Sequence, residues 1–267
     1  RYIWMGTFHS IFYRILRQEA ARLGFDANFT IYDTSNSESL LTTIIKERNL
    51  STDDYKPRDI HSRISLAKNN LVTAEAYAAN TSFAAEDRQR RRPEFGAIYQ
   101  EYARRCKANN AMDFDDLLIY TNILFRDFPD ALATYQNRFR YILVDEYQDT
   151  NYAQYLIVRR LAQAHSNVCV VGDDAQSIYS FRGAKIENIL RFQNDFPTAK
   201  VFKLEQNYRS TQNIVNAANS IIAKNKRQIP KNVLSENATG DKDTKLKAYT
   251  ATEKTLQVDD SIKPKGT

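Results

Sequence analysis

The chain has 267 residues, of which 42% are hydrophobic, and its 38 Lys and Arg exceed its 32 Asp and Glu, giving a net charge of +6. This size and composition support one large or two smaller globular domains. No run approaches the roughly 18 to 20 apolar residues of a membrane span, and the first residues lack the layout of a signal peptide, so we expect a cytoplasmic protein without membrane association. The mild positive charge is compatible with binding a polyanion and equally with ordinary surface charge.

The first residues predict a helix. Apolar side chains between residues 7 and 23 recur at helical spacing, Thr7 or Ser10 can cap the start, and Gly24 can end it. From about residue 36 to residue 107 the composition is helical and polar, with no run typical of a strand. We therefore expect an all-helical insertion, and we expect its basic stretch at residues 87–92 to be a solvated helix end or loop, although it could contact phosphates.

An alternating pattern of strands and helices follows the insertion. A helix begins near residue 112, with acidic residues at its positive end, and continues to about residue 125. Alternation of this kind predicts a doubly wound parallel sheet. In chain order we expect a strand at 141–144, a helix at 152–163, a strand at 168–171, a helix at 186–196, a strand at 201–204 and a helix at 211–224. Of the two cysteines, which lack any disulfide or zinc spacing, Cys169 should be a buried residue of the second strand.

The first strand ends on two adjacent acids, Asp145 and Glu146. Its short apolar run bounded by charge is typical of a strand buried on both faces of a parallel sheet, and ligands of such sheets bind beyond the carboxyl ends of the strands. One carboxylate there can hold Mg²⁺ while its neighbour orients and deprotonates an attacking water, as phosphoanhydride hydrolysis requires. The alternative is a strand end with two solvated acids.

Polar and aromatic residues also follow the other two strands. After the second strand, Gln176 suits a residue that contacts a terminal phosphate or its attacking water. Tyr179, Phe181 and Arg182 suit a base-stacking surface beside a charge, although such aromatics are often core residues. After the third strand, the pair Tyr208 and Arg209 could place a ring on a purine and a guanidinium on a phosphate. A helix start capped by Ser210 is the alternative there.

Taken together, these segments resemble the UvrD/Rep-type DNA helicases of superfamily 1. The resemblance extends to about residue 249, and residues from 255 onward match no motif. Phe181 stands where the family often has Trp, and Ala175 stands where a third acid is common. In order, the motifs that carry it are Gly6–Ser10, Asp113–Leu117, Val144–Thr150, Gly172–Ala184 and Gln206–Thr211.

The resemblance implies a RecA-like parallel sheet of the P-loop NTPase type with an all-helical insertion. It implies a motor that uses ATP and Mg²⁺ to move 3′ to 5′ on single-stranded DNA and to unwind duplexes at junctions, in DNA repair or replication. The fragment itself we expect to be monomeric. The implied division is residues 1–23 and 108–209 for the first motor domain, 24–107 for the insertion, and 210–267 for the start of the second motor domain and a tail.

The resemblance also implies a role for each matching residue. Asp145 would hold Mg²⁺, and Glu146 would be the catalytic base. The residues that would bind the nucleotide are Gln176 and Arg209 at the γ-phosphate, Arg182 nearby and Tyr208 on the adenine. The residues that would contact the DNA strand are Thr7, His9, Tyr179 and Phe181.

One element of a complete ATPase is missing from the sequence. None of the seven glycines lies in a G-x-x-x-x-G-K-[ST] motif, the loop that cradles phosphates, and the chain does not begin with Met. We therefore expect an inactive fragment of an active enzyme. The alternatives are a noncatalytic module that binds nucleic acid or a protein partner, and a nuclease-linked member of the same family, which would need a nuclease domain elsewhere in the gene.

Overall fold

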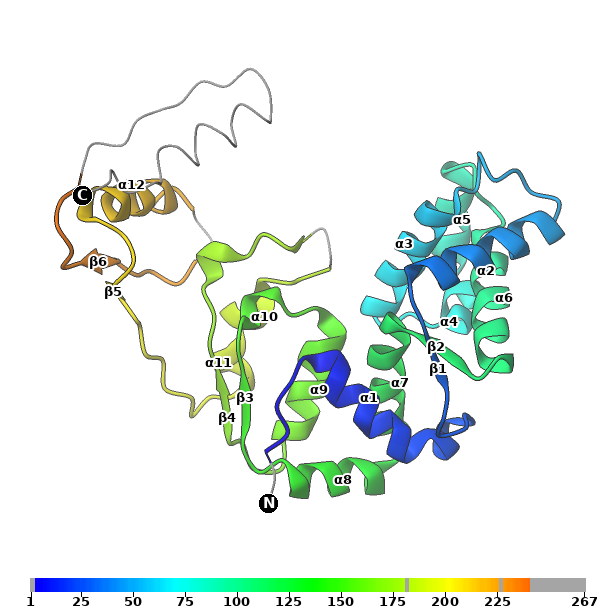
Figure 1. The fold of residues 1–267 in the computed structure, drawn as a ribbon, viewed down its shortest axis with the longest axis horizontal. Coiled ribbons are helices and arrows are strands. Elements are labelled where there is room, and N and C mark those ends of the chain that lie inside the picture. Colours follow the sequence, from blue (N-terminus) through cyan, green and yellow to red (C-terminus); the bar gives the residue numbers. More distant parts are fainter. Residues whose placement is uncertain (1–2, 181–182, 226–227, 241–267) are drawn as a thin grey trace, which may run out of the picture. The chain divides into compact units, whose positions relative to one another are not determined.

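The computed structural model describes residues 3–180, 183–225 and 228–240. It forms two compact units, residues 1–199 and 200–267, in which helices alternate with small parallel sheets (Figure 1). Within the described residues, no helix combines the length and the apolar character needed to cross a membrane.

The expected first helix is confirmed, together with its cap and its end. Helix α1 spans Phe8–Glu19, and the side chain of Thr7 accepts a hydrogen bond from the backbone N–H of Ser10 at 3.3 Å. A short 3₁₀ helix, η1 (Ala20–Leu23), continues it, and Gly24 ends it in the left-handed conformation with φ 71°. The buried face of α1 then packs into the core of the first unit.

Residues 36–107 contain helices and no strand, as expected. The helices pack their apolar residues into a common core that includes Leu41, Ile60, Ile64 and Phe95. The basic stretch ends α5, where Asp87 is buried against Arg63. The helices are α2 (Thr34–Glu47), α3 (Pro57–Asn69), α4 (Ala74–Ala79), α5 (Thr81–Gln89) and α6 (Phe95–Ala108).

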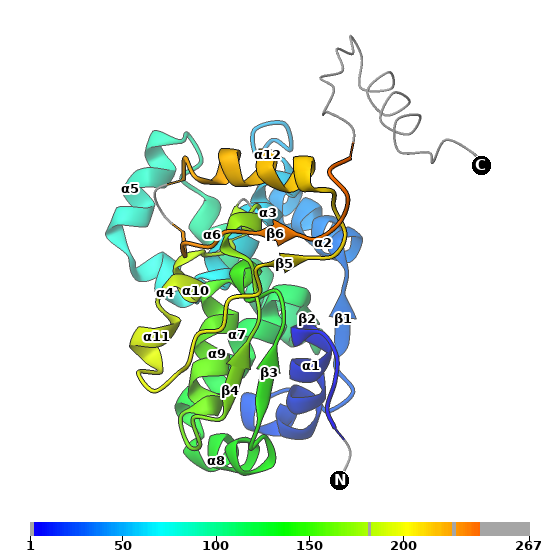
Figure 2. The same cartoon turned by 90° about the vertical axis from the view of Figure 1, so that its left-hand side faces the viewer.

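A short parallel strand pair flanks these helices. Strand β1 (Thr30–Tyr32) pairs with β2 (Ala111–Asp113), and β2 leads directly into α7 (Phe114–Asp127). The sequence predicted a helix start in place of β2, because a strand of three residues gives too short a pattern to detect. Helix α7 is largely buried between α1, α3 and α9 (Tyr152–Ala162), and α8 (Pro129–Arg138) follows it (Figure 2).

The predicted strand–helix–strand unit around Asp145 is present. Strand β3 (Ile142–Val144) pairs in parallel with β4 (Val168–Val170), and α9 connects them. Val144 and Val158 form a small core between the sheet and α9. Two 3₁₀ turns follow the strands, η2 (Tyr147–Asp149) after β3 and η3 (Asp174–Gln176) after β4.

Burial of this sheet on both faces was wrongly predicted. Leu143 is 78% exposed and Cys169 is also exposed, because α9 covers only one face and no described element of the unit covers the other. The third strand, at 201–204, was also wrong: this segment is irregular, and Leu204 is exposed. The predicted helix at 186–196 is broken into α10 (Glu187–Leu190) and α11 (Phe192–Asp195), since Arg191 leaves the helical conformation at φ −97° and ψ 2°.

The second unit contains a small parallel pair and one helix. Strand β5 (Gln206–Asn207) pairs with β6 (Leu234–Ser235), and α12 (Gln212–Ile222) confirms the helix expected at 211–224. The hydroxyl of Ser235 donates to the carbonyl oxygen of Ser210 at 2.7 Å, which ties β6 to the start of the helix. The unmatched stretch from residue 255 onward lies outside the described residues.

Candidate functional site

The two adjacent acids lie where β3 ends. The backbone N–H of Glu146 donates to Asp145 Oδ1 at 2.9 Å, and both side chains are exposed. Glu146 adopts the left-handed conformation, with φ 50° and ψ 41°, which is uncommon for residues other than glycine and costs about 1–3 kcal/mol. The chain therefore turns sharply at the point where the acids leave the sheet.

Asp145 fits the chemistry of a magnesium ligand. Its Oδ2 has no hydrogen-bond partner among the described residues, and an exposed carboxylate oxygen is a hard donor of the kind that Mg²⁺ prefers. Within the same residues, no three His, Cys, Asp or Glu side chains cluster to form an all-protein metal site. Phosphate-linked Mg²⁺ needs only one or two protein carboxylates, with water and phosphate oxygens completing its coordination.

A buried glutamine connects Glu146 with the turn after β4. Gln148 is 1% exposed, and its Nε2 donates to Glu146 Oε2 at 2.8 Å. Its Oε1 accepts from the backbone N–H of Asp173 at 3.0 Å, and Asp173 Oδ2 accepts from Gln176 Nε2 at 2.8 Å. Glu146 and Gln176, both predicted from the sequence, are thus linked through two residues to which the sequence assigned no role.

The backbone at Gly172 makes this link sterically feasible. A Cβ at position 172 would lie 2.5 Å from Gln148 Oε1 and 3.2 Å from the backbone nitrogen of Tyr147. The backbone N–H of Tyr147 also donates to Val171 O at 2.9 Å, which extends the pairing of the two strands up to the acids. Only glycine leaves room for the glutamine amide at this distance.

A third carboxylate lies beside the first two. Asp149 Oδ2 is 3.4 Å from Gln148 Nε2, whereas its Oδ1 is buried with no hydrogen-bond partner. Desolvation, followed by the negative charge of Glu146, raises the pKa of Asp149. Asp149 therefore adds a third carboxyl group beside the two acids, one that ionises less readily than an exposed aspartate.

The residues expected to contact DNA occupy the start of α1 and the turn after η3. Thr7 is exposed and caps α1, and the ring of His9 meets the ring of Phe114 edge-on at 5.9 Å. Burial lowers the pKa of His9, so the imidazole is neutral at neutral pH. Tyr179 is exposed, whereas Phe181 and Arg182 lie outside the described residues.

Phe114 is a further candidate residue, to which the sequence motifs assigned no role. It is the first residue of α7, and half of its surface is exposed beside His9. The available signal was an aromatic residue within the Asp113–Leu117 motif, between two acids where a solvated polar residue would be expected. An exposed aromatic next to an imidazole is a surface on which a base can stack.

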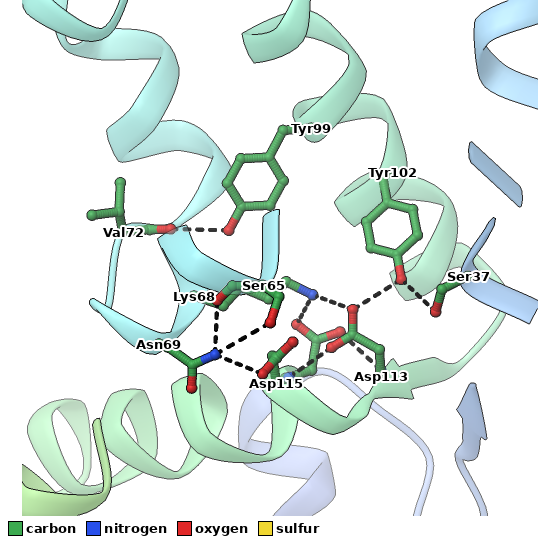
Figure 3. Close-up of polar contacts among 10 residues, drawn as sticks. Ser37, Ser65, Lys68, Asn69, Val72, Tyr99, Tyr102, Asp113 and Asp115 are labelled. Carbon is green, nitrogen blue, oxygen red and sulfur yellow. Dashed lines mark hydrogen bonds and ion pairs between the residues drawn. The ribbon is translucent and has the colours of Figure 1, made fainter. Parts of the chain in front are cut away.

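A buried charge cluster lies at the start of α7, the helix that carries Phe114 (Figure 3). Lys68 Nζ, on α3, lies 2.7 Å from Asp113 Oδ2 and 2.6 Å from Asp116 Oδ1, and all three side chains are buried. Tyr102 OH donates to Asp113 Oδ2 at 2.9 Å. Burial alone would lower the pKa of Lys68, but the charges of Asp113 and Asp116 outweigh burial and raise it, so the ammonium stays charged. The start of α7 is thereby fixed to α3.

The neighbouring residue, Asn69, extends the cluster toward the acids. Its Nδ2 donates to Asp115 Oδ1 at 2.9 Å, and its Oδ1 accepts from Asn151 Nδ2. Asn151 caps α9 through the N–H of Gln154 at 2.9 Å, a few residues after Glu146. Three helices, α3, α7 and α9, therefore meet through the polar side chains of Asn69, Asp115 and Asn151.

The remaining predicted residues, Tyr208 and Arg209, belong to the second unit. Both side chains are exposed, and the turn that carries them is held by Asn207 Oδ1, which accepts from the N–H of Arg209 at 2.9 Å and of Ser210 at 2.8 Å. Helix α12 begins at Gln212 and is preceded by Thr211, so Ser210 is not its cap.

Comparison with known proteins gives a consistent assignment. Residues 1–197 match the model of the UvrD/REP helicase N-terminal domain, and residues 202–265 match that of the UvrD-like helicase C-terminal domain. The chain is 46% identical over 250 residues to the ATP-dependent DNA helicase PcrA of Leuconostoc citreum, covering 94% of this chain and 33% of that protein. It is 46% identical over 245 residues to PcrA of Staphylococcus epidermidis, covering 90% and 32%. The chain thus spans about a third of the length of these relatives.

Proposed function

The chain belongs to the UvrD/Rep family of helicases, and we propose on this premise that it forms part of a motor that couples ATP hydrolysis to 3′–5′ movement on single-stranded DNA. The similarity to proteins named ATP-dependent DNA helicase PcrA supports this proposal. The observation that carries it is the hydrogen-bonded chain from Glu146 through Gln148 and Asp173 to Gln176 at the edge of a parallel strand pair.

At the nucleotide side, each residue has a distinct task. Asp145 holds Mg²⁺, which when bound neutralises charge on the phosphates. Glu146 accepts the proton of the attacking water, while Gln176 contacts the γ-phosphate. From the second unit, Arg209 stabilises charge that develops on the phosphate and Tyr208 stacks on the adenine. Arg182, outside the described residues, assists at the phosphate.

At the DNA side, the proposed contacts are mainly with a single strand. Thr7 and His9 lie at the start of α1, where backbone N–H groups and the helix dipole favour a phosphate. Phe114 adds a ring beside His9, and Tyr179 and Phe181 add rings after η3. Junctions of single- and double-stranded DNA are the proposed substrates, in repair or replication.

We further propose a RecA-like arrangement in the complete motor. Residues 1–23 and 108–209 contribute to the first motor domain, residues 24–107 form a helical insertion in it, and residues 210–267 begin the second motor domain and a tail. The division into compact units at residue 199 and the two family matches support a change of domain in this part of the chain.

By itself the chain should hydrolyse little or no ATP. It contains no G-x-x-x-x-G-K-[ST] motif, so the backbone amides and the lysine that position the β- and γ-phosphates are not supplied. Catalysis of phosphoryl transfer depends almost entirely on such positioning and charge stabilisation. Activity is therefore proposed for the full-length protein, meaning this chain together with any segments that flank it.

The test is Glu146→Gln in the full-length protein. We expect DNA-stimulated ATP hydrolysis to fall by about 10²-fold or more, since a general base contributes on the order of 10²–10⁴. Affinity for a labelled single-stranded oligonucleotide, measured by fluorescence anisotropy, should stay unchanged. Glu75→Gln, at an exposed position on α4, is the matched control and should retain both properties.

Two results would contradict the proposal. Loss of DNA binding with retained hydrolysis would show that Glu146 is not the base. A wild-type protein that binds single-stranded DNA without hydrolysing ATP would favour a noncatalytic nucleic-acid-binding module on the same scaffold.

A further inference from the structure

We propose that Gln148 is a positioning residue that fixes the Glu146 carboxylate and couples it to the turn at residues 172–177. The inference rests on the proposed function, because it assumes that Glu146 acts on the attacking water. Gln148 itself is buried behind the acids and is not proposed to touch the nucleotide.

The orientation of the Gln148 amide follows from its neighbours. Its Nε2 faces two carboxylates, Glu146 at 2.8 Å and Asp149 at 3.4 Å, and its Oε1 faces the backbone N–H of Asp173 at 3.0 Å. If the amide were reversed, its oxygen would face two carboxylates and its NH₂ group would face an N–H donor. One orientation satisfies every contact, so the amide is a rigid link between the acids and the turn.

This link leaves one oxygen of the base available. Gln148 is the only side chain among the described residues that donates to the Glu146 carboxylate, and it binds Oε2. A general base must present a free oxygen to the proton that it accepts. With Oε2 held, Oε1 is the oxygen that faces the water.

The same link extends to the residue proposed to contact the γ-phosphate. Asp173 donates its backbone N–H to Gln148 and accepts a hydrogen bond from Gln176 on its side chain. The hydroxyl of Ser177 is also 3.4 Å from the carbonyl oxygen of Gln148. Gln176 and the Glu146 carboxylate are thus joined through two hydrogen-bonding residues, Asp173 and Gln148.

Gln148→Met in the full-length protein tests the link. Methionine has nearly the same length and volume, but it can form neither hydrogen bond. We expect kcat for ATP hydrolysis to fall about 10- to 100-fold, because a misplaced catalytic group costs up to about 10²-fold. The KM for ATP and the affinity for single-stranded DNA should change by less than about twofold, since neither ligand contacts Gln148.

Gln136→Met is the matched control. Gln136 is a glutamine of α8 that donates one hydrogen bond to the carbonyl oxygen of Arg160 at 2.8 Å, away from the acids. It should leave kcat unchanged, so a loss specific to Gln148→Met is not a general effect of removing a glutamine hydrogen bond.

Gln148→Glu separates positioning from packing. When protonated, the introduced carboxyl can donate to Glu146 Oε2 and still accept from the Asp173 N–H; when ionised, it adds a negative charge beside Glu146 and Asp149. The kcat of Gln148→Glu relative to wild type should therefore rise as the pH is lowered from about 8 to about 6, and that of Gln148→Met should not. A purely structural role would give no such rescue.

Each outcome is decisive. Wild-type kcat in Gln148→Met, or a Gln148→Glu variant that follows Gln148→Met at every pH, would overturn the positioning role. If Gln148→Met does not fold, Gly172→Ala is the deciding variant, because its Cβ would lie 2.5 Å from Gln148 Oε1 and would displace the amide. A similar loss of kcat supports the positioning role, and an unchanged kcat overturns it. A wild-type protein without ATP hydrolysis would overturn the proposed function together with this inference.

Discussion

Two regions of the first unit, the helical segment at residues 36–107 and the β3–β4 pair, differ in how far they bury their apolar residues. In the helices, Ile60 and Ile64 are completely buried in a core that also contains aromatic residues such as Phe95. In the sheet, Leu143 is 78% exposed, although it stands in an equally apolar run. The difference shows that amphipathic helices can cover one another locally, whereas a strand of a parallel sheet depends on layers contributed by distant segments.

The largest expected effect comes from removing the buried ammonium of Lys68, which lies on α3 of the helical segment. Lys68→Met should leave the carboxylates of Asp113 and Asp116 buried without a cation, and such an unpaired charge costs about 3–5 kcal/mol. Urea unfolding of this chain, followed by circular dichroism, measures the loss. Lys46→Met, at an exposed position of α2, is the control and should stay within about 0.5 kcal/mol of wild type.

A double variant distinguishes charge from packing at the same place. Lys68→Met combined with Asp113→Asn removes the carboxylate whose pKa the Lys68 charge helps to keep low, and it should recover part of the lost stability. If the double variant is no more stable than Lys68→Met, the cluster acts through packing and the charge argument is wrong.

The next largest effect on the free energy of unfolding is expected when one apolar residue is truncated in each of the two regions. Ile60→Ala should destabilise the chain by about 2–5 kcal/mol, because it removes a fully buried side chain and leaves a cavity. Leu143→Ala should change stability by no more than about 0.5 kcal/mol, as is usual for an exposed position. Equal losses for the two variants would mean that the open face of the sheet is covered in solution.

The smallest effect concerns His9 of α1, whose ring meets that of Phe114 of α7 outside the two regions compared. Burial lowers the pKa of His9 in the folded chain, with Asp115 acting in the opposite direction, so protonation is less favourable there than in the unfolded chain, whose pKa is near 6.5. Stability from this residue is present above about pH 6.5 and is lost as the pH falls below it. The melting temperature should thus decrease from about pH 7.5 to about pH 5.5 more for wild type than for His9→Gln.

An equal pH dependence in the two proteins would assign the titration to another group, of which Asp115 and Asp116 are the nearest candidates. Both carboxyls have raised pKa values, chiefly because they are buried.

Much of the local structure could be predicted from the sequence. Thr7 and Gly24 marked the two ends of the first helical segment, and the apolar run before Asp145 marked a strand. These signals act within a few residues, where capping geometry and hydrophobic periodicity determine the conformation. The positions of Asp145 and Glu146 at the end of a strand followed from the same local pattern.

The contacts between distant segments could not be predicted. Lys68 and Asp113 are 45 residues apart, and Gln148 and Asp173 are 25 residues apart, so no periodic pattern connects them. The predictions of a buried Cys169 and of a strand at 201–204 were wrong for the same reason. An apolar run becomes a buried strand only where another layer covers it. The candidate Phe114 was not predicted, because an aromatic residue beside acids gives no periodic signal.

The left-handed backbone at Glu146 has an evolutionary consequence. A glycine there would relax the turn and a β-branched residue would strain it further, so thermodynamic selection alone favours replacing the glutamate. Keeping a glutamate at this position costs folding free energy, so the rest of the unit must be stable enough to tolerate it. Stabilising changes elsewhere, such as in the helical core, would therefore widen the range of sequences in which this acid can be kept.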